Sequence, residues 1–314
     1  MNNIILTVPE EASGLRLDKW LTSQIEDLTR TAVQNLVESG EVLVNGKTVA
    51  KNYKQKAGDV VEINIPEPVE LNTEPENIPL DIIYEDSSLL VVNKPKGMVV
   101  HPAPGNYSGT LVNALLYHCG DSLSGINGVI RPGIVHRIDK NTSGLVLCAQ
   151  NAFAAPELAK TAQKCYLALV EGPLPVGSGR IDVPIARRGD SIIGRCVREG
   201  GKPSVTEYTV LAASASHALV SCFPVTGRTH QIRVHFSWLG HPLAGDSLYG
   251  GHTDIIARHA LHCAVLRFNR PADHEPRRVQ SPLPEDFLAA CCAAYLPDKE
   301  EIQTMLQSVL PCAE

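Results

Sequence analysis

The hydrophobic positions near the start of the chain predict a small unit of two helices and a short sheet. Apolar residues recur at helical spacing in two stretches, and apolar and polar residues then alternate as far as Asn45-Gly46, a pair typical of a tight hairpin turn. We therefore expect a compact domain at residues 14–66. Its helices are expected around residues 15–21 and 33–39, and its strands at 42–44 and 60–65.

From residue 81 onward, short apolar runs are separated by turns, and helical patterns are few. This order predicts a mixed α+β domain at residues 81–290 rather than a doubly wound α/β domain. An acidic, proline-rich linker is expected at 67–80 and a C-terminal tail at 291–314. The predicted strands include residues 89–93, 145–149, 166–170, 204–211 and 218–222, and the predicted helices cover 110–118, 154–163 and 300–310.

The formal charge of the whole chain is −6, which by itself argues against a polyanionic partner. The distribution of the charged residues along the sequence changes this conclusion. Residues 67–86 hold seven acidic and no basic residues, and residues 283–314 hold six acidic residues and Lys299. Removing the −7 and −5 of these two segments leaves +6 on the remainder. A nucleic-acid partner is therefore compatible with the sequence, because a local basic surface matters more than the total charge.

Targeting signals and cysteine usage indicate a soluble, cytoplasmic protein. The N-terminus lacks the pattern of a signal peptide, and no apolar run reaches the roughly 18 residues that a membrane-spanning helix needs. The nine cysteines include no C-x-x-C pair, which favours reduced thiols over a disulfide framework or a zinc site. We expect a monomer without membrane contact.

The most informative stretch is His-Arg-Ile-Asp-Lys-Asn-Thr-Ser-Gly at residues 136–144, just before a strand-like apolar run. Asp139 stands between Arg137 and Lys140, and an opposite charge within about 4–6 Å favours the ionised form of a carboxylate. An ionised aspartate is suited to act as a nucleophile. The alternative is an aspartate that caps a turn at the end of a strand, with both cations exposed to solvent.

Two basic segments are candidates for contact with phosphate groups. One precedes a Gly-Asp turn in the N-terminal domain, and the other lies among glycines with few acidic residues nearby. The alternative for the first is a solvated lysine face. The first consists of Lys47, Lys51, Lys54 and Lys56, and the second of Arg187, Arg188, Arg195, Arg198 and Lys202.

Several motifs occur in an order that resembles the RluA family of pseudouridine synthases. Besides residues 136–144, they are Lys-Cys-Tyr-Leu-Ala-Leu-Val at 164–170, Gly-Arg-Thr-His-Gln-Ile-Arg-Val-His at 227–235 and Gly-His-Pro-Leu-Ala-Gly-Asp at 240–246. Residues 101–117 and 123–133 are similar to the RluD branch of that family. The N-terminal domain resembles the small α-L RNA-binding module of a small-subunit ribosomal protein.

The resemblance covers residues 14–290 and implies a fold and an activity. The fold is α+β, with a mixed, mainly antiparallel, bisected sheet flanked by helices in the catalytic domain and a small N-terminal α-L RNA-binding domain. The activity is isomerisation of uridine to pseudouridine in large-subunit ribosomal RNA, free or in a pre-ribosomal particle. Neither a cofactor nor a metal is implied.

The resemblance assigns catalytic roles to three residues. Asp139 is the nucleophile or base, and the sequence leaves open whether it acts on the sugar or on the ring. Arg233 pairs with Asp139, the alternative being an arginine at the rim of a strand. Tyr166 stacks on the target base, the alternative being a core tyrosine.

Other residues are assigned to RNA binding and base flipping. Arg137 fills the gap that the flipped uridine leaves, and His136 orients its loop, contacts phosphate or is structural. Arg228 and the four lysines of the N-terminal domain bind RNA. His230, His235 and His241 could suggest a metal site, but no carboxylate or cysteine spacing completes one, so we expect no metal.

Several competing functions remain open. A glycosidase or nucleoside hydrolase that uses Asp139 would need a second carboxylate, for which Asp246 is the candidate. A non-catalytic RNA-binding or ribosome-assembly factor would use only the basic segments, and a synthase could also act on transfer RNA. A kinase is excluded because no glycine-rich phosphate loop with a strand lysine is present.

Overall fold

The computed structural model describes residues 2–24, 30–50, 52–65, 73–103, 106–120, 133–151, 154–189, 193–307 and 309. The chain forms two compact units, Met1–Glu70 and Leu71–Glu314. Lys51, the N-terminal half of the predicted linker and most of residues 123–133 lie outside the described residues. Within the described parts of the chain, no helix is long and apolar enough to cross a membrane.

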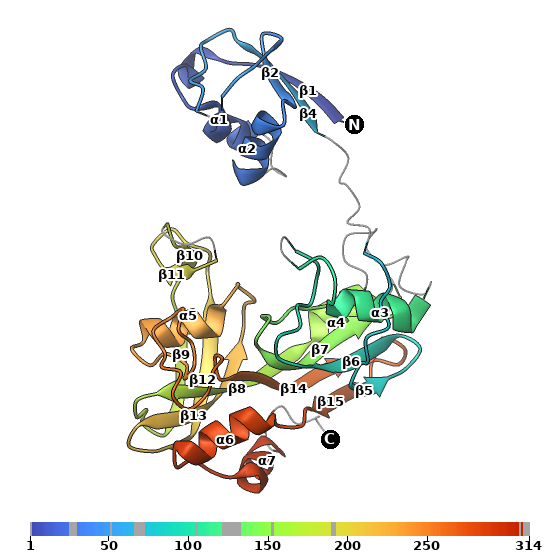
Figure 1. Cartoon of the computed structure of the whole chain (residues 1–314), viewed down its shortest axis with the longest axis vertical. Coiled ribbons are helices and arrows are strands. Elements are labelled where there is room, and N and C mark those ends of the chain that lie inside the picture. Colours follow the sequence, from blue (N-terminus) through green and yellow to red (C-terminus); the bar gives the residue numbers. More distant parts are fainter. Residues whose placement is uncertain are drawn as a thin grey trace. The chain divides into compact units, whose positions relative to one another are not determined.

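The N-terminal unit is an antiparallel sheet with two helices against it (Figure 1). Apolar side chains of the helices pack on the sheet, and Leu17, Leu21 and Ile63 are almost completely buried. Asn45 and Gly46 have φ angles of 52° and 75°, which is the backbone of the predicted hairpin turn. The elements are β1 (Asn2–Thr7), α1 (Leu17–Gln24), α2 (Arg30–Glu38), β2 (Val42–Val44), β3 (Lys47–Thr48) and β4 (Val60–Ile65). The first strand, β1, lies before residue 14 and pairs with β4 along its length.

The C-terminal unit is built on a sheet of nine strands, in the order β5-β6-β7-β14-β8-β13-β12-β9 with β15 on β14. All its pairings are antiparallel except that of β7 with β14. The strands are β5 (Ile82–Glu85), β6 (Leu89–Lys94), β7 (Ser143–Ala149), β8 (Gln163–Glu171), β9 (Gly177–Asp182), β12 (Val205–Ala213), β13 (His217–Pro224), β14 (Leu261–Asn269) and β15 (Pro276–Gln280). A separate hairpin consists of β10 (Ile185–Arg187) and β11 (Arg195–Val197).

The seam between β7 and β14 divides the sheet into two halves. These strands pair only at Ser143 with His262 and at Gly144 with Cys263. Gly144 has a φ of 106°, and a Cβ atom there would lie 2.3 Å from the carbonyl oxygen of Cys263. Only glycine fits this conformation and this close approach of two backbones. The predicted α+β class with a bisected, mainly antiparallel sheet is confirmed.

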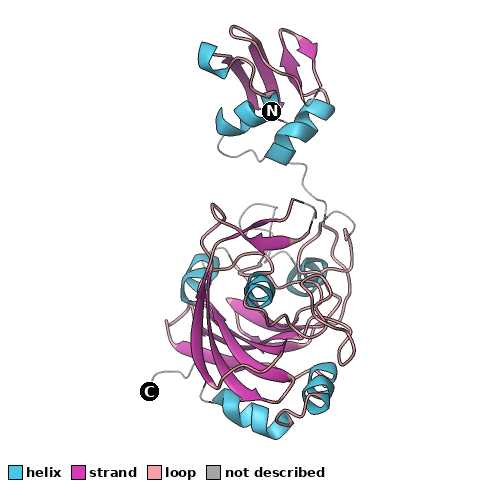
Figure 2. Cartoon of the chain, turned by 90° about the vertical axis from the view of Figure 1, so that its left-hand side faces the viewer, coloured by secondary structure: helices cyan, strands magenta, loops and turns pink. Residues whose placement is uncertain are grey.

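Helices cover both faces of the sheet (Figure 2), and each face has its own hydrophobic core. The first core includes Leu115 of α3 and Phe236 of α5, and the second includes Phe287 of α6 and Ile302 of α7. Residues beyond 290 therefore contribute to a core, since Ile302 and Leu306 are completely buried. The helices are α3 (Leu111–Cys119), α4 (Ala154–Thr161), α5 (Gln231–Trp238), α6 (Glu285–Ala293) and α7 (Lys299–Gln307).

The structure rules out one of the alternatives that the sequence left open. Arg233 lies within helix α5, so the alternative that placed it at the rim of a strand does not hold. The segment from Gln231 to His235 is almost entirely buried, including its polar residues, so an alternating pattern of burial is absent from it. A short helix that is buried on most sides lacks the amphipathic stripe that identifies surface helices in a sequence.

Candidate active site

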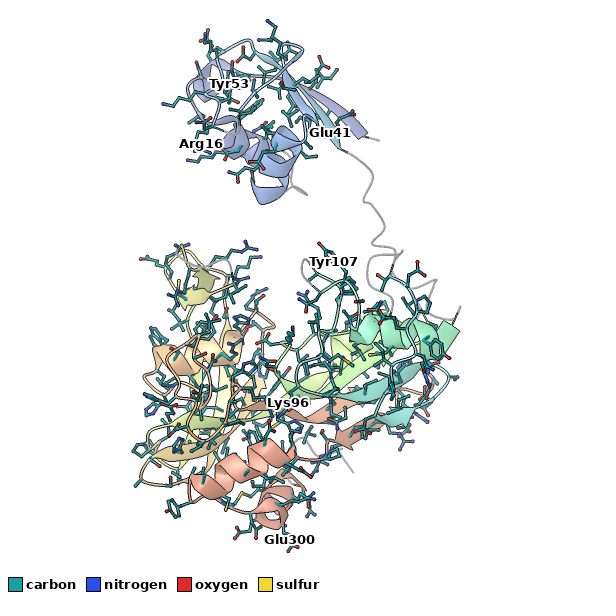
Figure 3. The ribbon with its side chains drawn as sticks, in the orientation of Figure 1. Arg16, Glu41, Tyr53, Lys96, Tyr107 and Glu300 are labelled. Carbon is teal, nitrogen blue, oxygen red and sulfur yellow. The ribbon has the colours of Figure 1, made fainter. Side chains whose placement is uncertain are left out.

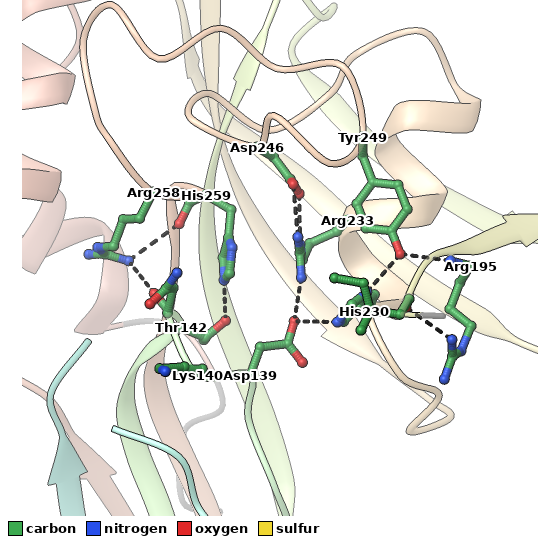
Figure 4. Close-up of polar contacts among 12 residues, drawn as sticks. Asp139, Lys140, Thr142, Arg195, His230, Arg233, Asp246, Tyr249, Arg258 and His259 are labelled. Carbon is green, nitrogen blue, oxygen red and sulfur yellow. Dashed lines mark hydrogen bonds and ion pairs between the residues drawn. The ribbon is translucent and has the colours of Figure 1, made fainter. Parts of the chain in front are cut away.

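Asp139 lies in the turn that leads into β7, where its carbonyl oxygen accepts a hydrogen bond from the backbone N–H of Thr142 at 3.1 Å. Its side chain is 25% exposed, and Arg233 of α5 donates from Nη1 to Asp139 Oδ2 at 3.0 Å (Figure 4). The structure therefore brings together two residues that are far apart in the sequence. Lys140, one of the two flanking cations, donates instead to the side chain of Asn106 at 3.0 Å.

A second carboxylate fixes the orientation of Arg233. Its Nε and Nη2 donate to Oδ2 and Oδ1 of Asp246 at 2.7 and 2.8 Å, and both side chains are nearly buried. Burial alone would lower the pKa of Arg233, but the hydrogen bonds and charge of Asp246, followed by those of Asp139, raise it. The guanidinium is thus a permanent cation that donates to Asp139 from its third nitrogen, Nη1.

The same contacts argue against the hydrolase alternative. A glycosidase would need Asp246 as a second acid or base that reaches the substrate. Both carboxylate oxygens of Asp246 accept hydrogen bonds from Arg233, and its side chain is 1% exposed. Asp246 therefore serves to hold Arg233.

Three side chains from other segments hold the turn after Asp139. Lys94 donates to the carbonyl oxygen of Lys140 at 3.1 Å, and Arg258 donates to that of Asn141 at 3.2 Å. The Thr142 hydroxyl and His259 Nε2 are 2.8 Å apart. Burial lowers the pKa of Lys94 to about 7, against the attraction of Asp139, and burial also lowers the pKa of His259 to about 4. His259 is therefore neutral at pH 7.

Arg258 is itself held from the C-terminal part of the chain. It donates from Nε and Nη2 to the two carboxylate oxygens of Asp286 in α6, at 2.8 and 3.0 Å. Lys96, at the surface beside α6 (Figure 3), donates to the same carboxylate at 2.8 Å. The hydrogen bonds from Arg258 hold the pKa of Asp286 well below its usual range. Sequence reasoning missed Lys94, Arg258 and His259, whose only signal was a charged or polar residue at the edge of an apolar run.

Tyr166 lies on β8 with its side chain 7% exposed. Burial, reinforced by the charges of nearby groups that include Asp139, raises the pKa of its hydroxyl well above the usual value. Tyr166 is therefore uncharged throughout the physiological range. Its ring forms part of the wall of the cleft that contains Asp139.

The cleft has a volume of about 570 Å³, which is within the range of small-molecule and nucleotide sites. Its walls come from the segments around residues 99–103, 134–142 and 224–233, together with Lys164 and Tyr166. Every residue of the C-terminal unit that the sequence assigned to the site lines this cleft: His136, Arg137, Asp139, Tyr166, Arg228 and Arg233.

The remaining predicted residues differ in how they are placed. Arg137 and Arg228 are exposed at the cleft, and Arg228 donates from Nε to the carbonyl oxygen of Pro203 at 3.0 Å. His136 Nε2 accepts the backbone N–H of Leu147 at 3.1 Å, and burial lowers the pKa of its ring to about 3. A neutral ring that bonds the backbone favours the structural alternative for His136 over contact with phosphate.

The predicted lysines of the N-terminal domain form part of a separate unit. Lys47, Lys54 and Lys56 are exposed there. The histidines considered as metal ligands do not converge, since the partners of His235 and His241 are Thr206 and the carbonyl oxygen of Glu171. Among the described residues, no group of three or more His, Cys, Asp or Glu side chains could hold a metal ion.

Comparison with known proteins identifies the class. Residues 88–238 match the family model described as RNA pseudouridylate synthase, and residues 15–61 match the S4 domain. The chain belongs to the RNA pseudouridine synthase family, whose members are isomerases.

Two individual relatives and one solved structure show how far the similarity extends. A Zymomonas mobilis protein named ribosomal large subunit pseudouridine synthase D is 43% identical over 303 residues, covering 90% of this chain and 94% of that protein. A Bacillus subtilis protein named uncharacterized RNA pseudouridine synthase YlyB is 49% identical over 293 residues, covering 91% of this chain and 96% of that protein. The solved structure of human RNA pseudouridylate synthase domain containing 1 has a TM-score of 0.56 and 29% identity, covering 80% of this chain and 100% of that one. The predicted family resemblance is confirmed.

Proposed function

We propose that this chain isomerises specific uridines to pseudouridine in large-subunit ribosomal RNA, with Asp139 acting on the target nucleotide. The observation that carries the proposal is the pairing of the part-exposed Asp139 with the buried Arg233 in a cleft that also contains Tyr166. The choice of ribosomal RNA is supported by relatives that are named ribosomal large subunit pseudouridine synthase D.

The reaction balances without an oxidant or reductant. The bond between C1′ of the ribose and N1 of uracil breaks, the uracil turns, and a bond forms between C5 and C1′. The proton on C5 is lost, and N1 gains one. Asp139 serves either as the nucleophile at the sugar or as a base, and the hydrogen bond from Arg233 Nη1 keeps its carboxylate oriented.

Two other residues of the cleft, Arg137 and Tyr166, position the target nucleotide. A uridine inside an RNA helix cannot present C1′ and C5 to a carboxylate, so it must leave the stack. Arg137 is exposed at the cleft, where it can take the space of the flipped base. Tyr166 offers a neutral ring against which the uracil can lie.

RNA outside the cleft binds to basic groups on both units. Arg228 contacts RNA near the cleft, and the exposed lysines of the S4 domain bind phosphates. We place the enzyme in the cytoplasm as a monomer that needs no cofactor.

The test measures release of hydrogen from C5-labelled uridine in large-subunit ribosomal RNA. The intact protein should release it, and Asp139→Asn should lower the rate by at least about 10³-fold, because the amide has no charge to act with. Asp182→Asn is the matched control, since Asp182 is 60% exposed and does not line the cleft. Equal rates for intact protein and Asp139→Asn would contradict the proposal.

Product analysis separates the remaining alternatives. A hydrolase would release free uracil, whereas a synthase releases none. Release of label from transfer RNA, with none from ribosomal RNA or immature ribosomal particles, would move the substrate to transfer RNA. Binding without release from any RNA would indicate a non-catalytic factor.

A further inference from the structure

His230 occupies an unusual backbone position at the edge of the cleft. It precedes the first residue of α5 and has φ and ψ angles of 58° and 22°, in the left-handed region that few residues other than glycine adopt. Its side chain makes no capping hydrogen bond to the helix. A residue in this conformation costs stability, and such residues are concentrated at functional sites.

The Tyr249 hydroxyl fixes the ring of His230. The backbone N–H of Arg195, in β11, donates to this hydroxyl at 3.0 Å, and the hydroxyl lies 2.7 Å from His230 Nδ1 (Figure 4). The hydroxyl accepts from Arg195 and has one proton of its own to donate, which we assign to the bond with Nδ1. The neutral ring then carries its hydrogen on Nε2. Burial lowers the pKa of His230, which favours this neutral form.

The Nε2–H group of His230 lies near the carboxylate of Asp139. Nε2 is 3.9 Å from Asp139 Oδ2, too far for a hydrogen bond, and the His230 side chain is 14% exposed. Among the residues that the structure describes, none accepts a hydrogen bond from Nε2. The cleft therefore presents an unused donor beside the catalytic carboxylate.

We propose that His230 is a further catalytic residue, which donates a hydrogen bond from Nε2 to an oxygen of the target nucleotide next to Asp139. The inference rests on the proposed function, because it places a uridine in the cleft. Tyr249 is then a positioning residue that acts through His230 by fixing which ring nitrogen carries the hydrogen. The donor is already oriented before RNA binds, so no reorganisation is needed when charge develops.

The first experiment measures single-turnover rates at saturating RNA. His230→Ala should lower the rate on the order of 10- to 100-fold, and His230→Gln, which supplies an amide N–H, should recover a substantial part of it. Both variants place a non-glycine residue in the same left-handed backbone conformation. The difference between their rates therefore measures the contribution of the hydrogen-bond donor. His274→Ala is the control, because His274 has a φ of 60° and is exposed outside the cleft.

The second experiment tests whether Tyr249 affects the rate through its hydrogen bond with His230. Tyr249→Phe keeps the ring that contacts Arg233 and removes the hydroxyl. It should lower the rate about 3- to 10-fold in the intact protein and have no further effect in His230→Ala. Equal losses in both backgrounds would overturn the role of Tyr249.

The two proposals fail in different ways. If the intact protein forms no pseudouridine, the proposed function fails. If the intact protein is active and His230→Ala matches it, or if His230→Gln is no faster than His230→Ala, the inference about His230 fails alone.

Discussion

Arg233 is one cation shared by two carboxylates, and the two contacts have different consequences. The paired hydrogen bonds to Asp246 are buried and secure the guanidinium, whereas Asp139 is part-exposed and keeps access to the cleft. Removing Arg233 should therefore affect both stability and catalysis. The two effects can be separated because Asp139 lines the cleft and Asp246 does not.

Arg233→Ala should lower the free energy of unfolding by about 3–5 kcal/mol, since Asp246 is left buried without a partner. The single-turnover rate should fall on the order of 10³-fold. In Arg233→Ala/Asp246→Ala, stability should return in part while the rate stays low, because Asp139 still lacks its cation. Urea unfolding measures the stability, and release of label from C5 measures the rate. If the rate recovered together with the stability in the double variant, Arg233 would have only a structural role.

The sequence indicated the residues that line the cleft better than it indicated what holds them. Asp139, Tyr166 and Arg233 were found together because each belongs to a recognisable motif. The flanking cation Lys140 was considered for its charge beside Asp139, and its ammonium group donates to the side chain of Asn106. Contacts such as Arg258 to the carbonyl oxygen of Asn141 depend on the folded path of the backbone, which periodicity does not reveal.

Among the elements, strands β7 and β14 are the pair on which the site depends most. Strands such as β6, β7, β8, β12 and β13 were predicted because alternation and apolar runs are local signals, whereas β14 was not predicted. The parallel pairing of β7 with β14, the helix α5 and the core role of α7 were not predicted, since each arises from tertiary packing. Gly144 is the residue at which this pairing can be tested.

Gly144→Ala should lower the free energy of unfolding by about 3 kcal/mol or more, because its Cβ would meet the backbone of Cys263. Unfolding can be followed by the fluorescence of Trp238 in a Trp20→Phe background, since the chain has two tryptophans. Gly189→Ala, where nothing lies within 4 Å of the new Cβ, should change stability little. Equal stability of the two variants would argue against close contact at the seam.

Over the whole molecule, the chain consists of two units that each have a hydrophobic core. This organisation was predicted from the acidic, proline-rich segment between them. It allows affinity for RNA and catalysis to be assigned to different parts of the chain.

Removal of residues 1–70 should weaken binding to ribosomal RNA by about tenfold or more while changing the single-turnover rate at saturating RNA by less than about twofold. The dependence of log Kd on log salt concentration should also become less steep, by about 0.7–0.9 for each lost phosphate contact. Filter binding over a series of salt concentrations measures both. If Kd and its salt dependence stayed unchanged, the lysines of this unit would not contribute to RNA binding.

The hydrogen bonds that Arg258 donates to Asp286 and to the turn after Asp139 also bear on the order of events during synthesis. A growing polypeptide folds from its N-terminus, so the S4 unit can form while the rest is still being translated. Asp139 is translated before the residues that hold it and the turn after it, which include Arg233, Arg258 and Asp286. We therefore expect a chain that stops before α6 to have a folded S4 unit but an incompletely supported turn after Asp139, so that catalysis would begin only when translation is nearly complete.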